Sequence, residues 1–113
     1  MKEIKAVIQP FMLGKVIDRL KELGELPGVT VSEVKGFGKG QAKNAKDVVQ
    51  EDSVDFILKA KLEIVVVDAM VDQVVRAIAE SARTGQMGDG KIFVYDVSDV
   101  VKVRTGERGE RAI

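Results

Sequence analysis

Three glycines and a lysine lie within residues 84–93, TGQMGDGKIF, and this combination suits phosphate binding. Gly85-x-x-x-x-Gly90-Lys91 matches most of a Walker A loop, in which backbone N–H groups and a lysine surround the phosphate oxygens. Ile92 stands where that motif has serine or threonine, and the loop follows an expected helix and precedes an expected strand, the reverse of a Walker A loop. The helix dipole therefore does not favour an anion here, and phosphate would depend on loop N–H groups and Lys91.

Part of this glycine content has a purely structural explanation. Gly85 is placed where a helix C-cap glycine and a tight turn into the next strand belong. Gly88, Asp89, Gly90 and Lys91 together contain more glycine than such a turn needs, which favours a ligand.

Two further cations follow in the tail. Lys102 and Arg104 are two residues apart in a segment expected to be extended, so both side chains should leave one face and form a polyphosphate clamp with Lys91. Charge-assisted contacts contribute roughly 1.5–3 kcal/mol each, so three of them with an apolar base pocket could reach the micromolar range. The alternative is an ordinary solvated, charged tail.

The composition limits the other kinds of chemistry. The chain has 113 residues, 45% of them hydrophobic, with 18 basic and 18 acidic residues and neither cysteine nor histidine. Thiol catalysis, histidine-based triads and Cys/His zinc sites are excluded, and neutrality disfavours nucleic-acid binding. We expect one domain over residues 1–113, no catalytic or metal-binding residues and, without a signal peptide or membrane span, a cytoplasmic location.

The elements that must position these residues alternate along the chain. The patterns predict a strand ended by Pro10, a helix ended near Gly24, a strand entering Gly36 and Gly38, and a polar loop over 39–54. A strand over 55–67, a helix with Asp68 as N-cap, and a strand from Lys91 follow, before a tail over 98–113. Two such βαβ units predict an α+β ferredoxin-like βαββαβ sandwich, with two helices on one face of a four-stranded antiparallel sheet. The uncovered face should carry Val7, Val65 and Phe93, and we expect a homo-oligomer to cover it.

Four segments carry a resemblance to a known family. VSEVKGFG at 31–38, VDF at 54–56, ARTGQMGDGKIFV at 82–94 and RTGE at 104–107, with the opening IKAVIQPF, resemble the PII nitrogen-regulatory signal-transduction family. The resemblance covers essentially the whole chain. It implies a homotrimer with an ATP or ADP site, and Mg²⁺ with ATP, in each cleft between neighbouring subunits.

The resemblance also implies roles for individual residues. The phosphate loop, within residues 84–91, would be Gly88, Asp89, Gly90 and Lys91, joined by Lys39 and by Lys102 and Arg104 of a neighbouring subunit. The base and ribose would be lined by Val7, Thr30, Gly36, Phe37, Gly38 and Val65. Lys59 matches the lysine that contacts 2-oxoglutarate in the family, and residues 39–54 correspond to the T-loop, which contacts client proteins.

Several positions depart from the family pattern. Lys39 and Lys102 stand where the family usually has arginine, which removes the bidentate fork. Gly40 replaces a glutamine that helps to place Mg²⁺ and 2-oxoglutarate, and Gln41 follows one place later. Asp52 replaces the modified tyrosine, so uridylylation there is impossible. The arginine at the loop apex is also absent, with Lys43 or Lys46 as possible substitutes.

Three functions are consistent with these observations. The first is a regulatory sensor, not an enzyme, which binds ATP or ADP and controls a transporter or metabolic enzyme through its T-loop, with indirect membrane association through a transporter. The second is a slow ATPase or phosphatase, for which no general base stands out. The third is a ferredoxin-like oligomeric sensor of another small ligand.

Overall fold

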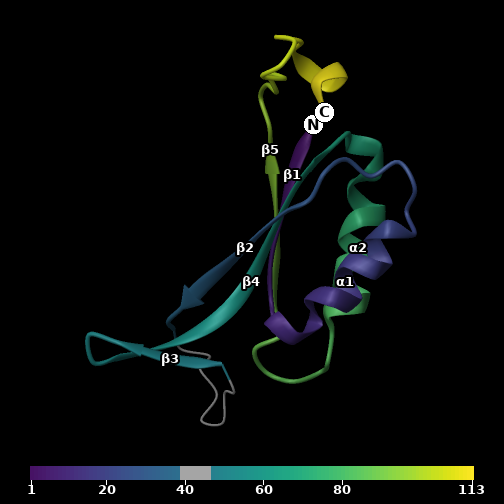
Figure 1. Cartoon of the computed structure of the whole chain (residues 1–113). Coiled ribbons are helices and arrows are strands. Elements are labelled where there is room, and N and C mark those ends of the chain that lie inside the picture. The colour runs from purple at the N-terminus through teal and green to yellow at the C-terminus, as the bar shows by residue number, and fades with distance from the viewer. Residues whose placement is uncertain (39–46) are drawn as a thin grey trace.

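The alternating residues at the start of the chain form the first strand of an antiparallel sheet. The computed structural model describes residues 1–38 and 47–113. Within them, helices α1 (Leu13–Lys21) and α2 (Val71–Ala82) cover one face of the sheet (Figure 1). The strand order along the sheet is β2 (Thr30–Gly36), β4 (Val54–Val66), β1 (Lys2–Ile8), β5 (Gly90–Asp96). This architecture confirms the predicted ferredoxin-like α+β fold.

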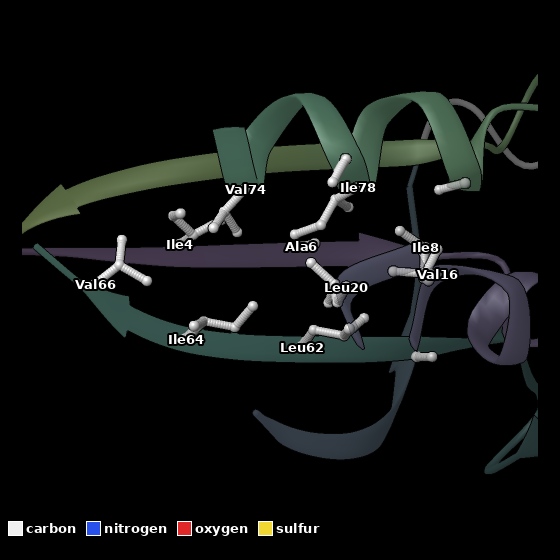
Figure 2. Close-up of a cluster of buried hydrophobic side chains, with 13 residues drawn as sticks. Ile4, Ala6, Ile8, Val16, Leu20, Leu62, Ile64, Val66, Val74 and Ile78 are labelled. Carbon is white, nitrogen blue, oxygen red and sulfur yellow. The ribbon is translucent and has the colours of Figure 1, made fainter. Parts of the chain in front are cut away.

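The core fills the space between the two helices and the sheet. Every second residue of the central strands points to the helices, and side chains at helical spacing on the two helices pack against them. Figure 2 shows these side chains facing one another: Ile4, Ala6 and Ile8 of β1, Leu62, Ile64 and Val66 of β4, Val16 and Leu20 of α1, and Val74 and Ile78 of α2. The branched aliphatic core fixes which face of each strand looks outward.

The register defines two ends of the sheet. At one end Ile8 pairs with both Ala60 and Gly90; we call this the glycine-loop end. At the other end Lys2 pairs with both Val66 and Asp96, and we call this the tail end. Figure 1 shows the turn between α2 and β5 at the first end, and both chain termini at the second.

A fifth strand lies inside the segment predicted to be a loop. Strand β3 (Val48–Glu51) pairs with the first residues of β4, joined by a turn in which Asp52 and Ser53 have φ values of 50° and 64°. Positive φ at both central residues is the type I′ geometry that closes two-residue hairpins. The prediction of continuous loop over 39–54 is therefore wrong for residues 48–51. The polar sequence hid this strand because its side chains are mostly exposed.

The position of β3 follows from one residue of β4. Ile57 pairs with Gly36 on one edge and with Val48 on the other. Strand β3 therefore occupies the same edge of β4 as β1, beyond the end of β1. The hairpin projects from the glycine-loop end of the sheet (Figure 1).

Asp68 does not cap the second helix, contrary to the sequence prediction. It begins a short 3-10 turn (Asp68–Met70) before α2 and makes no capping hydrogen bond. Its carboxylate instead accepts a hydrogen bond from the N-terminal ammonium of Met1 at 2.8 Å, which lowers the pKa of Asp68. The charge of Asp68 therefore pairs with the chain's N-terminus at the tail end of the sheet. No helix among the described residues is long and apolar enough to span a membrane.

The face of the sheet opposite the helices carries both apolar and charged side chains. Val7, Val65 and Phe93 alternate with helix-facing residues, so they lie on this open face as predicted. Lys5 lies there too, with its ammonium 5.4 Å from the ring centroid of Phe93 and 4.9 Å from that of Tyr95. The apolar character inferred from sequence is therefore mixed with cation–π pairs.

Glu3 on this open face is expected to reduce stability near neutral pH. Burial raises its pKa above the ordinary 4.5, and Glu63 raises it further, against the opposite effect of Lys5 and Lys61. The folded state therefore holds the proton of the Glu3 carboxyl more tightly than the unfolded state does. The contribution of Glu3 to the free energy of unfolding is complete below pH 4.5 and is lost as the pH rises through the raised pKa. We expect Glu3→Gln to increase the free energy of unfolding near pH 7 and to change it little near pH 4. Urea unfolding at both pH values measures this; equal effects at both would contradict it.

Candidate functional site

Gly90 is required by the close approach of two strands. It has a φ of +104°, and a Cβ atom there would lie 1.8 Å from the carbonyl oxygen of Val7. No side chain fits at that distance. This glycine is therefore needed to bring β5 against β1, whatever the loop binds.

The Asp89 carboxylate is held by the loop that precedes it. Its Oδ2 accepts hydrogen bonds from the backbone N–H groups of Thr84 at 2.8 Å and Gly85 at 2.9 Å. Its Oδ1 accepts one from the Thr84 hydroxyl, and that hydroxyl accepts one from the Gln86 N–H at 3.2 Å. Residues 84–89 are thus closed into a turn around one side chain.

These contacts favour the ionised carboxylate. The Thr84 hydroxyl contributes most to lowering the pKa of Asp89, with further help from the Thr84 and Gly85 amides and the Gln9 side chain, whereas burial opposes the shift. Asp89 therefore carries its negative charge inside the loop at neutral pH.

Gly85 does not serve as the C-cap of α2. The helix ends at Ala82, and its C-cap residue Arg83 is already extended, with φ −73° and ψ 128°. Gly85 lies two residues farther on, with a φ of +86°, and its N–H is bonded to Asp89. The C-cap prediction is wrong, because the carboxylate of Asp89 replaces the helix carbonyls as the partner of this N–H.

Lys59 connects β4 to the glycine loop. Its ammonium donates a hydrogen bond to the carbonyl oxygen of Gly88 at 2.5 Å. Gly88 has a φ of +91°, and a Cβ atom there would lie 3.6 Å from the Lys59 Nζ and 3.8 Å from the Gln9 Nε2. Sequence reasoning singled out Lys59 for an effector but did not foresee its contact with the loop, because the two are 29 residues apart.

The end of β2 lies at the same end of the sheet. Gly36 pairs with Ile57, next to the glycine-loop end of β4. The following Phe37 is exposed and meets Phe56 edge to face, with ring centroids 6.4 Å apart. Five further residues named from the sequence, Lys39, Gly40, Gln41, Lys43 and Lys46, lie outside the described residues.

The tail cations were predicted to lie in an extended segment, but the structure places them in and beside a turn. The Gly106 N–H donates to the Lys102 carbonyl at 2.7 Å, which closes a turn over residues 103–105. Lys102 lies 3.9 Å from the Glu107 carboxylate, whereas Arg104 is exposed. The alternation argument for their shared face is therefore wrong, since it holds only for strands.

The predicted nucleotide-binding residues divide into two groups within one chain. One group lies at the glycine-loop end: Val7, Gly36, Phe37, Gly38, Gly88, Asp89, Gly90 and Lys91. The other group lies away from that end: Thr30 is level with Lys5 in the middle of the sheet, and Val65, Lys102 and Arg104 lie near or beyond the tail end. Strand β5 separates Lys91 from the tail, and its 7 residues span about 20 Å. One chain does not bring Lys91 to Lys102 and Arg104.

A small cavity lies beside the glycine loop, on the helix side of the sheet. Its volume is about 260 Å³. Most of its lining is apolar, and only three of the predicted site residues, Asp89, Gly90 and Lys91, take part in it. The remaining lining residues are Ile8, Ile78, Ala79, Ala82, Arg83 and Ile92. Among the described residues, no group of three acidic, histidine or cysteine side chains could hold a metal ion.

Comparison with known proteins gives one consistent result. Residues 1–107 match the family model described as nitrogen regulatory protein P-II. The chain is 50% identical to a protein of that name from Pasteurella multocida and 47% identical to one from Rhodospirillum rubrum, over the full length of each. It also resembles the crystal structure of Arabidopsis thaliana PII bound to citrate, with a TM-score of 0.81 and 44% identity over 99% of this chain and 91% of that one.

Proposed function

Because this chain belongs to the nitrogen regulatory protein P-II family, we propose that it is a regulatory protein that binds ATP or ADP between the subunits of a homotrimer. The observation that carries the proposal is the division of the site residues between the two ends of the sheet. A phosphate chain that contacts both Lys91 and the tail cations must take them from different copies of the chain.

The two groups supply complementary chemistry. The glycine-loop end offers loop amides, the Lys91 ammonium and the backbone of Gly36–Gly38. The tail end of a neighbouring copy offers Lys102 and Arg104, with Thr30 and Val65 toward the base and ribose. Because these side chains are cations and phosphate is an anion, each contact is charge-assisted, which strengthens it relative to a neutral hydrogen bond.

The open face of the sheet supports the same assembly. Phe93 and Tyr95 remain 40% and 43% exposed in the single chain, beside Val7 and Val65. A face that combines aromatic rings with Lys5, Lys61, Glu3 and Glu63 suits contact with a copy of itself, because the chain supplies both charge signs. We propose that trimer formation covers this face.

The hairpin gives a physical route from nucleotide to client. Lys59 holds the Gly88 carbonyl and belongs to β4, whose first residues form the hairpin with β3. A nucleotide that changes the contact of Lys59 with the loop therefore acts on β4, the strand with which β3 pairs, and such coupling needs only a difference in affinity between two conformations of this hairpin. The client would be a transporter or a metabolic enzyme, with indirect membrane association in the first case. Uridylylation at position 52 is excluded, because Asp52 has no phenolic hydroxyl to modify.

Calorimetric titration with ATP, ADP and AMP, each with and without Mg²⁺, tests the proposal. We expect saturable ATP and ADP binding near the micromolar range, competition between the two, and no release of inorganic phosphate. Phosphate release at a rate above that of a Lys91→Ala control would support the ATPase alternative instead. No binding of any of the three would support a sensor of another ligand.

The same titration decides whether a dicarboxylate effector binds. Gly40 lacks the side chain that assists Mg²⁺ and 2-oxoglutarate in the family, although Lys59 supplies a cation. We expect 2-oxoglutarate to add little heat to the Mg-ATP complex. Citrate, which the Arabidopsis relative binds, serves as a second carboxylate probe. Strong synergy between 2-oxoglutarate and Mg-ATP would show that Gln41 replaces the missing glutamine.

A further inference from the structure

The glycine loop contains a carboxylate whose obvious use would be to bind Mg²⁺ or the nucleotide. Asp89 stands between Gly88 and Gly90, directly before Lys91, where a metal or ribose ligand would be well placed. The contacts of its two oxygens point to a different role.

Both oxygens already have partners within the loop. Oδ2 accepts two backbone N–H groups, those of Thr84 and Gly85, and Oδ1 accepts the Thr84 hydroxyl. A metal ion at either oxygen would have to displace donors that hold the loop together. A negatively charged phosphate would also be repelled by this carboxylate unless the loop donors screen it.

The same contacts divide the loop into two parts with different tasks. The amides of Thr84, Gly85 and Gln86 are used inside the loop, through Asp89 or through the Thr84 hydroxyl. The part from Gly88 to Lys91 is anchored from outside, by Lys59 at the Gly88 carbonyl and by the pairing of Gly90 with Ile8. Asp89 joins the two parts, since its side chain holds the first while its backbone belongs to the second.

We propose that Asp89 is a positioning residue and that Thr84 acts with it: together they hold the backbone of Gly88–Lys91 in the conformation that receives the phosphates, and neither binds the nucleotide or Mg²⁺. This inference rests on the proposed nucleotide site. It changes the role expected for Asp89 from the family resemblance, and it adds Thr84, which sequence reasoning did not single out.

Thr84→Val tests the pair, because valine keeps the shape of threonine and lacks the hydroxyl. We expect it to weaken ATP and ADP binding by about fivefold, equally with and without Mg²⁺, whereas Thr84→Ser, which keeps the hydroxyl, stays close to the parent protein. Asp89→Asn should weaken binding more than Thr84→Val, again independently of Mg²⁺. Asp18→Asn, an exposed aspartate on α1, is the charge control.

Different outcomes would overturn the proposal. If Asp89→Asn weakens only Mg-ATP, and leaves ATP and ADP without Mg²⁺ unchanged, Asp89 is a metal ligand. If Thr84→Val binds nucleotide like the parent protein, the hydroxyl does not position the loop. Thermal unfolding and the native mass of each variant in solution exclude loss of folding or assembly as the cause.

A ligand-free measurement separates this inference from the proposed function. Amide hydrogen exchange of Thr84 and Gly85 reports the bonds to Asp89 directly. We expect both amides to be protected in the parent protein and in Thr84→Ser, and to exchange faster in Asp89→Asn. If the parent protein binds no nucleotide yet shows this pattern, the loop scaffold is right and its proposed ligand is wrong; unprotected amides in the parent protein would reject the scaffold itself.

Discussion

Gly90→Ala is expected to destabilise the protein by about 3 kcal/mol or more, since positive φ costs a non-glycine residue roughly 1–3 kcal/mol and overpacking adds a similar amount. The added methyl group would lie 1.8 Å from the Val7 carbonyl oxygen and 2.8 Å from its carbonyl carbon. These are backbone atoms of the neighbouring strand, so no side-chain rotation relieves the contact. Either β5 moves away from β1, or the peptide at residue 90 rotates and the pairing with Ile8 is lost.

Gly14→Ala is the matched control, because the same chemical change should have the opposite sign there. Gly14 lies in α1 with no atom within 4 Å of an added Cβ and without a positive φ. Alanine at a helical position is favoured over glycine by about 0.5–1 kcal/mol. Urea unfolding of the two variants and the parent protein measures both effects. Similar stabilities for Gly90→Ala and the parent protein would show that the two strands are not this close in solution.

Lys91→Ala and Arg104→Ala are each expected to weaken ATP binding at least tenfold, about 1.4 kcal/mol, because each removes one charge from the phosphate site. The decisive test mixes them. If the site joins Lys91 of one subunit to Arg104 of another, a trimer containing both variants has some sites in which both residues are intact. Random assembly from equal amounts would restore about one site in four. Unfolding and refolding the two variants together, followed by calorimetry, counts these sites.

The mixing experiment has a clear contrary outcome. A site built within one chain cannot be restored, because every chain in the mixture lacks either Lys91 or Arg104. If subunit exchange is verified and no high-affinity site is found in the mixture, the shared site is rejected. Lys15→Ala, which removes an exposed lysine of α1, controls for the loss of a positive charge. It should change neither the affinity nor the number of sites.

Local patterns predicted most of the elements, because each depends on side chains close in sequence. Alternation identified β1 and β4, helical spacing identified α1 and α2, and Pro10 ended the first strand as expected. The same reasoning missed β3, since a short, mostly exposed hairpin strand has no apolar face to show alternation. It also misjudged Asp68, because the Met1 ammonium that competes for this carboxylate is 67 residues away.

For the candidate site too, the sequence indicated the residue types, and the structure was needed for the contacts between them. Residue types alone indicated phosphate binding at Gly88–Lys91 and further cations at Lys102 and Arg104. Other features of the site depend on contacts between segments that are distant in the sequence. Gly90 must be glycine because of Val7, and Lys59 holds the loop through the carbonyl of Gly88.

The amino-acid sequence by itself determined the two helices, the four main strands, the helix-facing core and the residue types of the proposed phosphate loop, since these follow from spacing and residue type along the chain. Only the tertiary structure decided that Lys91 and the tail cations lie at opposite ends of one sheet. The physical reason is that backbone hydrogen bonds between strands set which distant residues lie side by side, and the local residue composition hardly depends on these bonds.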